Sequence, residues 1–180
     1  MKKNEHDFVK RYKFTLLVLF SAWLACIVVA PLTVPANSVG DLSGGSMRID
    51  NAKVWGNMNP FAATVYFLGD SFCTEISDHS FYLNGNQMPF CARCTAIFAG
   101  LVVGMVIAIL FNPKISLLLL ALLALPVVID GGLQVVSSYQ STNLLRVVTG
   151  LLAGIAVSLY LSKLADAMLA PKSSKDETTA

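Results

Sequence analysis

Charged residues are scarce in this chain. Asp, Glu, Lys and Arg make up 13% of its 180 residues, whereas soluble domains carry roughly 25%. Hydrophobic residues make up 55%, and they gather in runs long enough to cross a bilayer. The composition therefore excludes a soluble domain. It predicts an all-α integral membrane helical bundle whose main partner is the lipid bilayer.

Familiar catalytic motifs are also missing. The chain contains no phosphate-binding loop, no HExxH sequence and no nucleophile elbow. Basic residues are sparse in its long polar segment, so we expect no nucleic-acid partner. Candidate chemistry is thereby limited to four cysteines and a few polar residues in or beside the apolar runs.

Four apolar runs predict about four transmembrane helices, over residues 14–34, 95–111, 115–136 and 144–161. The first run is an anchor or a signal peptide, since Val34-Pro35-Ala36 offers a small-residue cleavage site. Cleavage would leave three helices; we predict retention. The predicted organisation is one transmembrane domain (14–170) with an outer loop (37–90), between a cytoplasmic tail (1–13) and a disordered cytoplasmic tail (171–180).

Positive charge predicts the orientation of these helices in the cell membrane. Nine of the 13 Lys and Arg residues fall on one side: five before Phe14, Lys114 between the second and third spans, and Lys163, Lys172 and Lys175 after the last span. Four fall on the opposite side. Cytoplasmic segments carry the excess of Lys and Arg. Both termini are therefore expected in the cytoplasm. The sequence predicts no oligomeric state.

Small residues recur every four positions in the second span (Ala96, Gly100, Gly104) and in the last span (Gly150, Gly154). Such stripes let helix backbones approach closely in lipid. We predict that these two spans touch; the alternative is that one stripe serves a homodimer. In the outer loop, the apolar run 60–69 is too short to span. It is expected along the membrane interface, as a lid, or as a short buried helix.

Asp130 lies within the third span, where a charged side chain costs at least about 2.5–3.5 kcal/mol near the helix centre. Its nearest predicted partner is Arg146 in the last span. Gln134 shares a helix face with Asp130, and Asn143 shares one with Arg146. Three alternatives remain open: a structural ion pair, a carboxylate that binds substrate or acts in catalysis, and exposure at headgroup level.

Three cysteines are expected on the outer side: Cys73, Cys91 and Cys94. Cys91 and Cys94 flank Arg93 at the start of the second span, where the positive helix terminus stabilises thiolates. A single disulfide would leave one thiol over. With His79, the three cysteines form a four-ligand set of the kind zinc or another transition metal uses. A metal site, a redox-active or structural disulfide, and unlinked thiols all remain open.

All these residues are expected in one layer at the outer membrane face. We predict a site there with Asp130, Arg146 and Asn143 in catalytic roles, Arg93 and Gln134 in support, and the metal beside them. Convergence of polar residues from separate spans favours a site over scattered structural contacts.

Three segments resemble the motifs of a known family. The segment 84–95, Asn-Gly-Asn-Gln-Met-Pro-Phe-Cys-Ala-Arg-Cys-Thr, is similar to the signature of a family of small membrane proteins of unknown function, number 2085 in the domains-of-unknown-function series. Segments 126–134 and 141–150 resemble its second and third motifs. The resemblance covers about residues 73–154. It implies the location of a site and no particular reaction.

The chain departs from that family near the thiols. Where the family typically has Cys-His-Gln and then Arg-Ser-Phe, this chain has Cys73-Thr74-Glu75 and then His79-Ser80-Phe81. If the family histidine is a ligand, His79 or Glu75 would have to replace it. The family also commonly has Gly and Tyr at the positions of Ala96 and Phe98, so a hydroxyl near the thiols is missing.

Two main function classes follow. The first is a membrane metalloprotein, in an enzymatic version acting on a lipid or another membrane-soluble substrate. The second is a membrane thiol–disulfide oxidoreductase, which Cys91 and Cys94 beside Arg93 favour, although the chain has no second obvious cysteine pair to relay electrons. A non-catalytic partner protein is a third alternative.

Overall fold

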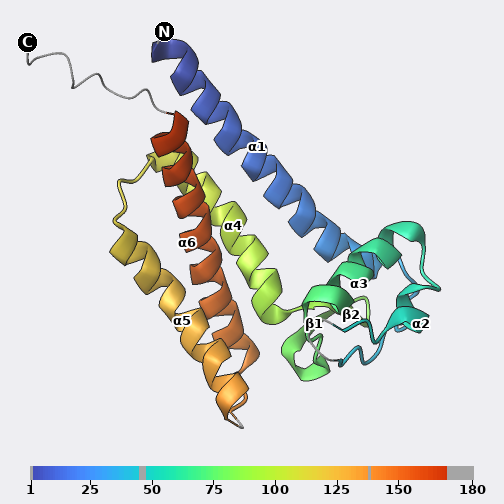
Figure 1. Ribbon diagram of the computed structural model, residues 1–180. Coiled ribbons are helices and arrows are strands. Elements are labelled where there is room, and N and C mark those ends of the chain that lie inside the picture. The colour runs from blue at the N-terminus through green and yellow to red at the C-terminus, as the bar shows by residue number, and fades with distance from the viewer. Residues whose placement is uncertain (1, 45–47, 138, 170–180) are drawn as a thin grey trace, which may run out of the picture.

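The structure is a computed structural model that describes residues 2–44, 48–137 and 139–169, and it shows a helical bundle with a small lobe at one end (Figure 1). Among these residues, four helices are long and apolar enough to cross a membrane: α1 (Lys2–Val29), α4 (Ala92–Phe111), α5 (Leu117–Val136) and α6 (Asn143–Leu169). The predicted fold class is thereby confirmed. The predicted disordered tail, 171–180, lies outside the described residues.

The lobe, which we call the cap (residues 30–91), connects α1 to α4. It lies at the end of the bundle opposite to the start of α1 and the end of α6 (Figure 1). Its elements are η1 (Ala30–Leu32), α2 (Ala52–Trp55), α3 (Pro60–Phe72), η2 (Ser77–His79), β1 (Ser80–Leu83) and β2 (Asn86–Cys91).

The antiparallel hairpin β1–β2 was not predicted, although its turn residues signal it. Asn84 and Gly85 connect the strands with φ values of 56° and 72°, and Leu83 pairs with Asn86. Two successive residues with positive φ form the turn that matches strand twist, and Asn-Gly is its preferred sequence. The turn delivers β2 directly into α4, so it sets the position of the first residues of α4.

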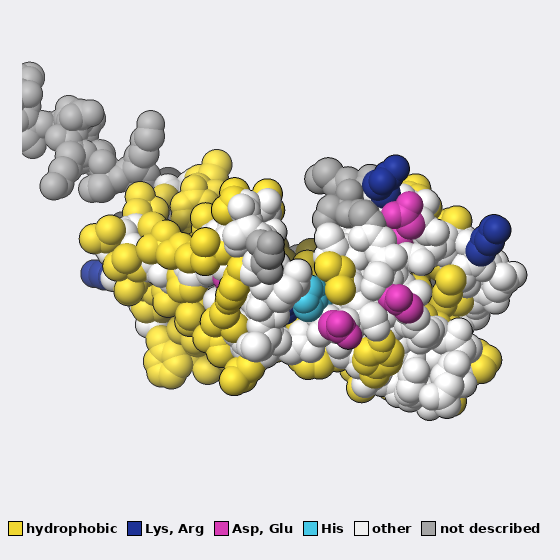
Figure 2. Space-filling model, turned by 90° about the horizontal axis from the view of Figure 1, so that it is seen from below, with side chains coloured by type: hydrophobic (Ala, Val, Ile, Leu, Met, Phe, Trp, Pro, Cys, Tyr) yellow, Lys and Arg dark blue, Asp and Glu magenta, His cyan; other side chains and the backbone are white. Residues whose placement is uncertain are grey.

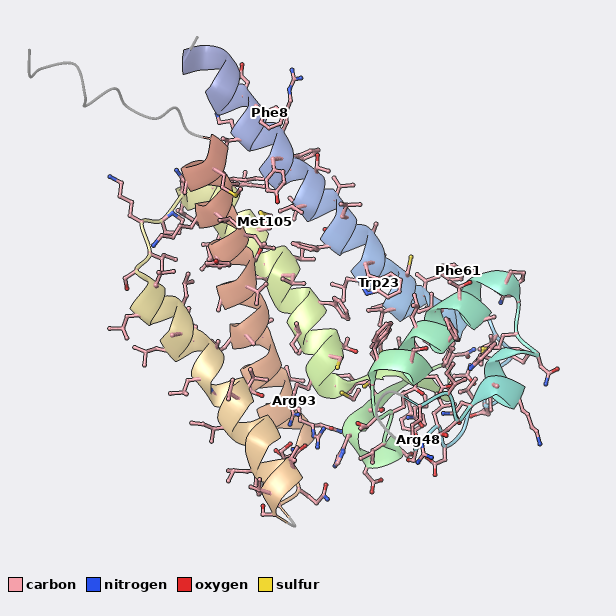
Figure 3. The ribbon with its side chains drawn as sticks, in the orientation of Figure 1. Phe8, Trp23, Arg48, Phe61, Arg93 and Met105 are labelled. Atoms are coloured by element: carbon pink, nitrogen blue, oxygen red, sulfur yellow. The ribbon has the colours of Figure 1, made fainter. Side chains whose placement is uncertain are left out.

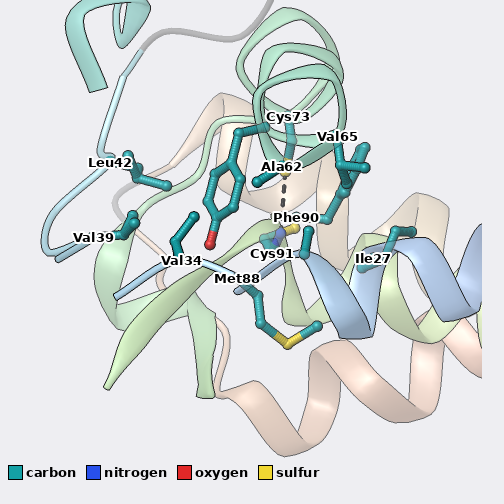
Figure 4. Packing of buried hydrophobic residues seen from close by; sticks show 12 residues of the cluster. Ile27, Val34, Val39, Leu42, Ala62, Val65, Cys73, Met88, Phe90 and Cys91 are labelled. Carbon is teal, nitrogen blue, oxygen red and sulfur yellow. Dashed lines mark hydrogen bonds between the residues drawn. The ribbon is translucent and has the colours of Figure 1, made fainter. Parts of the chain in front are cut away.

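The short apolar run forms α3, a helix in the cap's own core (Figure 4). Ala62, Val65 and Tyr66 are buried, and the Tyr66 hydroxyl donates to the Gln87 carbonyl at 2.7 Å. Gly69 lets β2 approach, because a Cβ there would lie 1.8 Å from the Pro89 carbonyl oxygen. One face of the run is therefore buried in the cap, as the buried-helix alternative expects, while Phe61, Phe67 and Phe72 on α3 are exposed.

Two fully buried side-chain amides of β2, those of Asn86 and Gln87, hold the irregular segment that follows η1. Asn86 accepts from the N–H groups of Ser38 and Val39 and donates to the carbonyls of Pro31 and Pro35. Gln87 accepts from the Leu42 N–H at 3.0 Å. These side chains satisfy backbone N–H and carbonyl groups that a neighbouring strand would otherwise satisfy. The segment after α1 can therefore pack without regular secondary structure.

α4 and α6 pack through their small residues, as predicted. A Cβ on Gly154 would lie 2.1 Å from the Ile97 carbonyl oxygen, and a Cβ on Gly100 would lie 2.3 Å from that of Leu151. Glycine thus allows the two backbones to touch. The contact fixes the first turns of α4 and α6 side by side.

α6 is longer than the predicted span and continues past Lys163 to Leu169. Asp166, in the added turns, forms an ion pair with Lys13 of α1 at 2.9 Å. Lys13 also donates to the Asn112 side chain at 3.0 Å. These contacts join α1 to the ends of α4 and α6 at the end of the bundle away from the cap.

Candidate metal centre

Three thiols meet where the cap joins the bundle. The sulfur atoms of Cys73, Cys91 and Cys94 all lie within 4.8 Å of one another. The Cys73 and Cys94 sulfurs are 3.8 Å apart, and the Cys91 N–H donates to the Cys73 sulfur at 3.4 Å, the dashed line in Figure 4. All four cysteines of the chain are free thiols. The predicted grouping of these three side chains is therefore present.

The local fold explains why residues 18 and 21 positions apart converge. Cys73 caps the end of α3, and its N–H bonds the Gly69 carbonyl at 2.8 Å. Cys91 ends β2 and is the N-cap of α4, so Cys94 lies in the first turn of that helix. The close approach of α3 to β2 at Gly69 places Cys73 over the cysteine pair.

The thiols differ in acidity. Hydrogen bonding by the Cys73 and Cys94 thiols lowers the pKa of Cys91, and the backbone N–H groups of Cys94 and Arg93 add to this effect. The hydrogen bond between the Cys73 and Cys91 thiols raises the pKa of Cys73 to about 11. The first thiolate of the cluster therefore forms at Cys91, the sulfur at the helix N-terminus.

His79, the predicted fourth ligand, does not belong to this group of sulfur atoms. It is buried, and its Nδ1 has no hydrogen-bond partner among the described residues. Burial, and next the positive charge of Arg146, lowers the pKa of His79. Both effects favour the neutral form of the His79 imidazole.

Glu75, the other replacement for the family histidine, is 2% exposed. Burial, and next repulsion from Asp70, raises the pKa of Glu75 to about 9. One of its carboxyl oxygens, Oε1, has no partner among the described residues. Asp70 satisfies its own carboxylate through the backbone N–H of Asn51 at 3.0 Å and the Trp55 indole at 3.0 Å.

A polar cluster lies next to the thiols, between the ends of α4, α5 and α6. Arg93, which Figure 3 shows at the end of α4 beside the cap, forms an ion pair with Asp130 of α5. Arg146 donates to the Gln134 side chain at 3.2 Å and to the Ser141 carbonyl at 3.3 Å. The Ser141 hydroxyl accepts from both Arg93 and Gln134.

The predicted pairing of Asp130 with Arg146 is therefore wrong. Arg93 projects from the first turn of α4 and reaches the carboxylate, while Arg146 is taken up by neutral acceptors. Asn143 is held away from Asp130, because its amide donates to the Asp78 carbonyl of the cap at 3.1 Å. Ser141 was not predicted as a site residue, although it begins the segment 141–150 that resembles the third family motif.

The apolar helices and the thiol layer define a helical membrane protein, and its family follows from comparison. The chain belongs to the family described as "Predicted membrane protein (DUF2085)", whose pattern matches residues 73–160. This segment contains the three clustered cysteines and the polar residues of α4, α5 and α6 described above. The resemblance inferred from the sequence motifs is confirmed.

Two similar proteins are uncharacterized archaeal proteins. One, from Methanocaldococcus jannaschii, is 29% identical over 160 residues, which are 85% of this chain and 92% of that protein. The other, from Methanothermobacter thermautotrophicus, is 36% identical over 90 residues, which are 48% of this chain and 81% of that protein. No solved structure matches the chain significantly.

Proposed function

We propose that Cys73, Cys91 and Cys94 bind one transition metal ion, zinc in the first instance. The 3.8 Å separation of the Cys73 and Cys94 sulfurs carries this proposal. Zinc–sulfur bonds of about 2.3 Å in a tetrahedral site put sulfur atoms about 3.8 Å apart. A disulfide would bring two of them to about 2.0 Å.

The number of thiols bears on the kind of metal site. Structural zinc sites have four protein ligands, whereas catalytic sites have three and keep a position for water or substrate. Since His79 lies outside the thiol group, the three cysteines leave that position free. We therefore place the protein among membrane metalloenzymes that act on a lipid or another membrane-soluble substrate. A bound zinc ion would supply Lewis acidity there.

The orientation of the chain is part of the proposal. Nine of 13 Lys and Arg residues belong to segments at the end of the bundle away from the cap or to the tails that continue from it. By the charge rule this end is cytoplasmic, and the thiol centre is on the outer face. An alkaline phosphatase fused after Ala180 should be inactive, whereas a fluorescent protein fused there should fluoresce.

Elemental analysis of protein purified in mild detergent tests the metal site. The wild type should contain about one zinc or iron ion per chain, and Cys94→Ser should lose it. Cys26→Ser is the matched control, because Cys26 lies in α1 outside the thiol group, and it should retain the metal. Metal-free wild-type protein would refute the proposal.

A thiol–disulfide oxidoreductase is the second candidate, favoured by the lowered pKa of Cys91 beside Arg93. It predicts that purified protein contains an oxidised pair and one free thiol in the cluster. It also predicts that Cys91→Ser and Cys94→Ser differ in trapping mixed disulfides. Three thiols that become reactive together when metal is removed would exclude it.

A further inference from the structure

The polar cluster beside the thiols contains two guanidinium groups and one carboxylate. Arg146 is 2% exposed, and its hydrogen-bond acceptors, the Ser141 carbonyl and the Gln134 amide oxygen, are both neutral. The carboxylate of Asp130 is used by Arg93. A buried charge is costly unless an opposite charge is close. Arg146 forms no ion pair among the described residues and shares the charge of Asp130 with Arg93.

The placement of both arginines adds to this excess. Arg93 lies in the first turn of α4, and Arg146 lies in the first turn of α6. Helix N-termini carry partial positive charge and favour anions, so a cation there is in the unfavourable position. Two helix ends and two guanidiniums therefore gather positive potential in one layer.

Several buried polar atoms in this layer have no partner among the described residues. They are Arg93 Nε, His79 Nδ1, Asn143 Oδ1 and Asp130 Oδ1. The two oxygens are acceptors, whereas Arg93 Nε and a protonated His79 Nδ1 are donors that an anion can use. His79 is 8% exposed, and its burial, followed by the positive charge of Arg146, lowers its pKa. Buried polar groups in native proteins are almost always satisfied, so the unfilled donors beside two guanidinium groups indicate the place of a ligand with acceptor oxygens.

We propose that this cluster is a subsite for an anionic group, a phosphate or a carboxylate, with Arg146 as its main contact and Arg93 and His79 beside it. The inference rests on the proposed function in one respect, since it names the substrate class of the thiol centre: a molecule with an anionic group. Arginine suits this role because its planar fork binds such groups through paired hydrogen bonds.

The thiol centre supplies part of the missing charge. Three thiolates and a divalent cation carry a net charge of −1, which together with Asp130 offsets the two guanidiniums. The two helix N-termini, worth about +0.5 each, remain. One further negative charge balances the layer. Asp130 competes for the same donors, so its removal should favour the ligand.

Phosphate binding to the metal-loaded protein in a nonionic detergent tests the subsite, with inorganic phosphate as the probe in equilibrium dialysis. Arg146→Gln should weaken binding at least ten-fold without changing metal content. Arg48→Gln is the matched control, since Arg48 is an exposed arginine of the cap, and it should bind as the wild type does. Wild-type affinity in Arg146→Gln would overturn the proposal.

A second variant should change phosphate affinity in the opposite direction. A gain in affinity cannot result from misfolding, so it complements the loss expected for Arg146→Gln. Asp130→Asn should bind phosphate several-fold more tightly, because it frees Arg93. A merely structural cluster predicts no gain, and weaker or unchanged binding would count against the subsite.

The source of the anion is distinguished by a second probe. In native mass spectrometry with phosphatidylglycerol or diacylglycerol added to the micelles, selective retention of phosphatidylglycerol by the wild type, lost in Arg146→Gln, identifies a lipid headgroup. Binding of inorganic phosphate without lipid selectivity identifies a free anion. Failure of both probes refutes the subsite. Wild-type protein that contains no metal as purified but still binds the anion refutes only the proposed metal centre.

Discussion

Arg93 and Asp130 form an ion pair that joins the first turn of α4 to the cap-facing half of α5. The Asp130 side chain is 4% exposed and that of Arg93 is 16% exposed. The pair lies at the end of the bundle next to the cap, where Figure 3 labels Arg93. Figure 2 shows that hydrophobic side chains dominate one part of the surface seen from below, whereas the other part is mixed. The ion pair links the residue between two cysteines of the thiol group to the charged residue inside α5.

Replacing one partner of this ion pair should lower the unfolding free energy more than replacing both partners. Arg93→Met leaves the Asp130 charge buried without a partner, and breaking a buried pair in this way costs about 3–5 kcal/mol. Arg93→Met combined with Asp130→Leu should recover much of that loss. A double-mutant cycle on unfolding free energies in detergent measures the difference, and additive single effects would contradict the coupling.

Gly154→Ala should destabilise the contact between α4 and α6. Its Cβ would lie 2.1 Å from the Ile97 carbonyl oxygen, so the helices must separate, at a cost of about 1–3 kcal/mol. Gly132→Ala in α5 is the control, because nothing lies within 4 Å of its Cβ. The control should be neutral or more stable. Equal melting temperatures for the two variants would rule out the close packing.

The sequence predicted the parts of this structure that depend on local pattern. Apolar runs identify spans because a bilayer demands length, and the glycine stripes identified the contact of α4 with α6 because small residues allow close approach. The position of the three thiols at one membrane face was predicted because successive spans alternate in direction. The Asn84-Gly85 turn was visible too, yet the short strands around it contain no clear alternation of polar and apolar residues.

Pairing within the site was not predictable, because it depends on side-chain reach. Arg93, Arg146 and Asp130 all belong to the layer expected from the sequence, and chain spacing gives no preference between the two arginines. β2 ends directly before α4 and so positions the first turn of α4, which places Arg93 beside Asp130. The roles of Asn86 and Gln87 were hidden for a related reason: fully buried amides look like loop residues in sequence.

Asn86→Ala should destabilise the cap severely. The change leaves four backbone groups without their partner: two N–H groups of Ser38 and Val39 and two carbonyls of Pro31 and Pro35. The contacts to the Val39 N–H and the Pro31 carbonyl are buried, and each buried group left unsatisfied costs about 1–3 kcal/mol. Limited proteolysis should show faster cleavage in the segment after α1. Asn57→Ala, which removes one exposed contact to Lys53, is the control and should be cleaved at the wild-type rate.

Metal removal should change thiol reactivity in one step. With metal bound, the sulfur atoms of Cys73, Cys91 and Cys94 are ligands and resist alkylation. A chelator should expose all three together, because each depends on the same ion. Alkylation counted by intact mass checks this in a Cys26→Ser background. Independent, one-by-one reactivity without a chelator effect would show that the thiols share no ion.

The first helix should be retained in the mature protein. Cleavage after Ala36 would separate α1 from a segment to which it is continuously packed: Asn86 bonds the Pro31 and Pro35 carbonyls before that point and the Ser38 and Val39 N–H groups after it. Trp23 of α1 also packs edge-on against Phe90 and Phe98. Lys13, 5% exposed, ties the other end of α1 to Asp166 and Asn112. A signal peptide needs none of these contacts, whereas an anchor that completes the cap and the bundle needs all of them. Intact-mass measurement of protein purified through a C-terminal tag should therefore show residues 14–36 present, and a mass that begins at residue 37 would contradict the prediction.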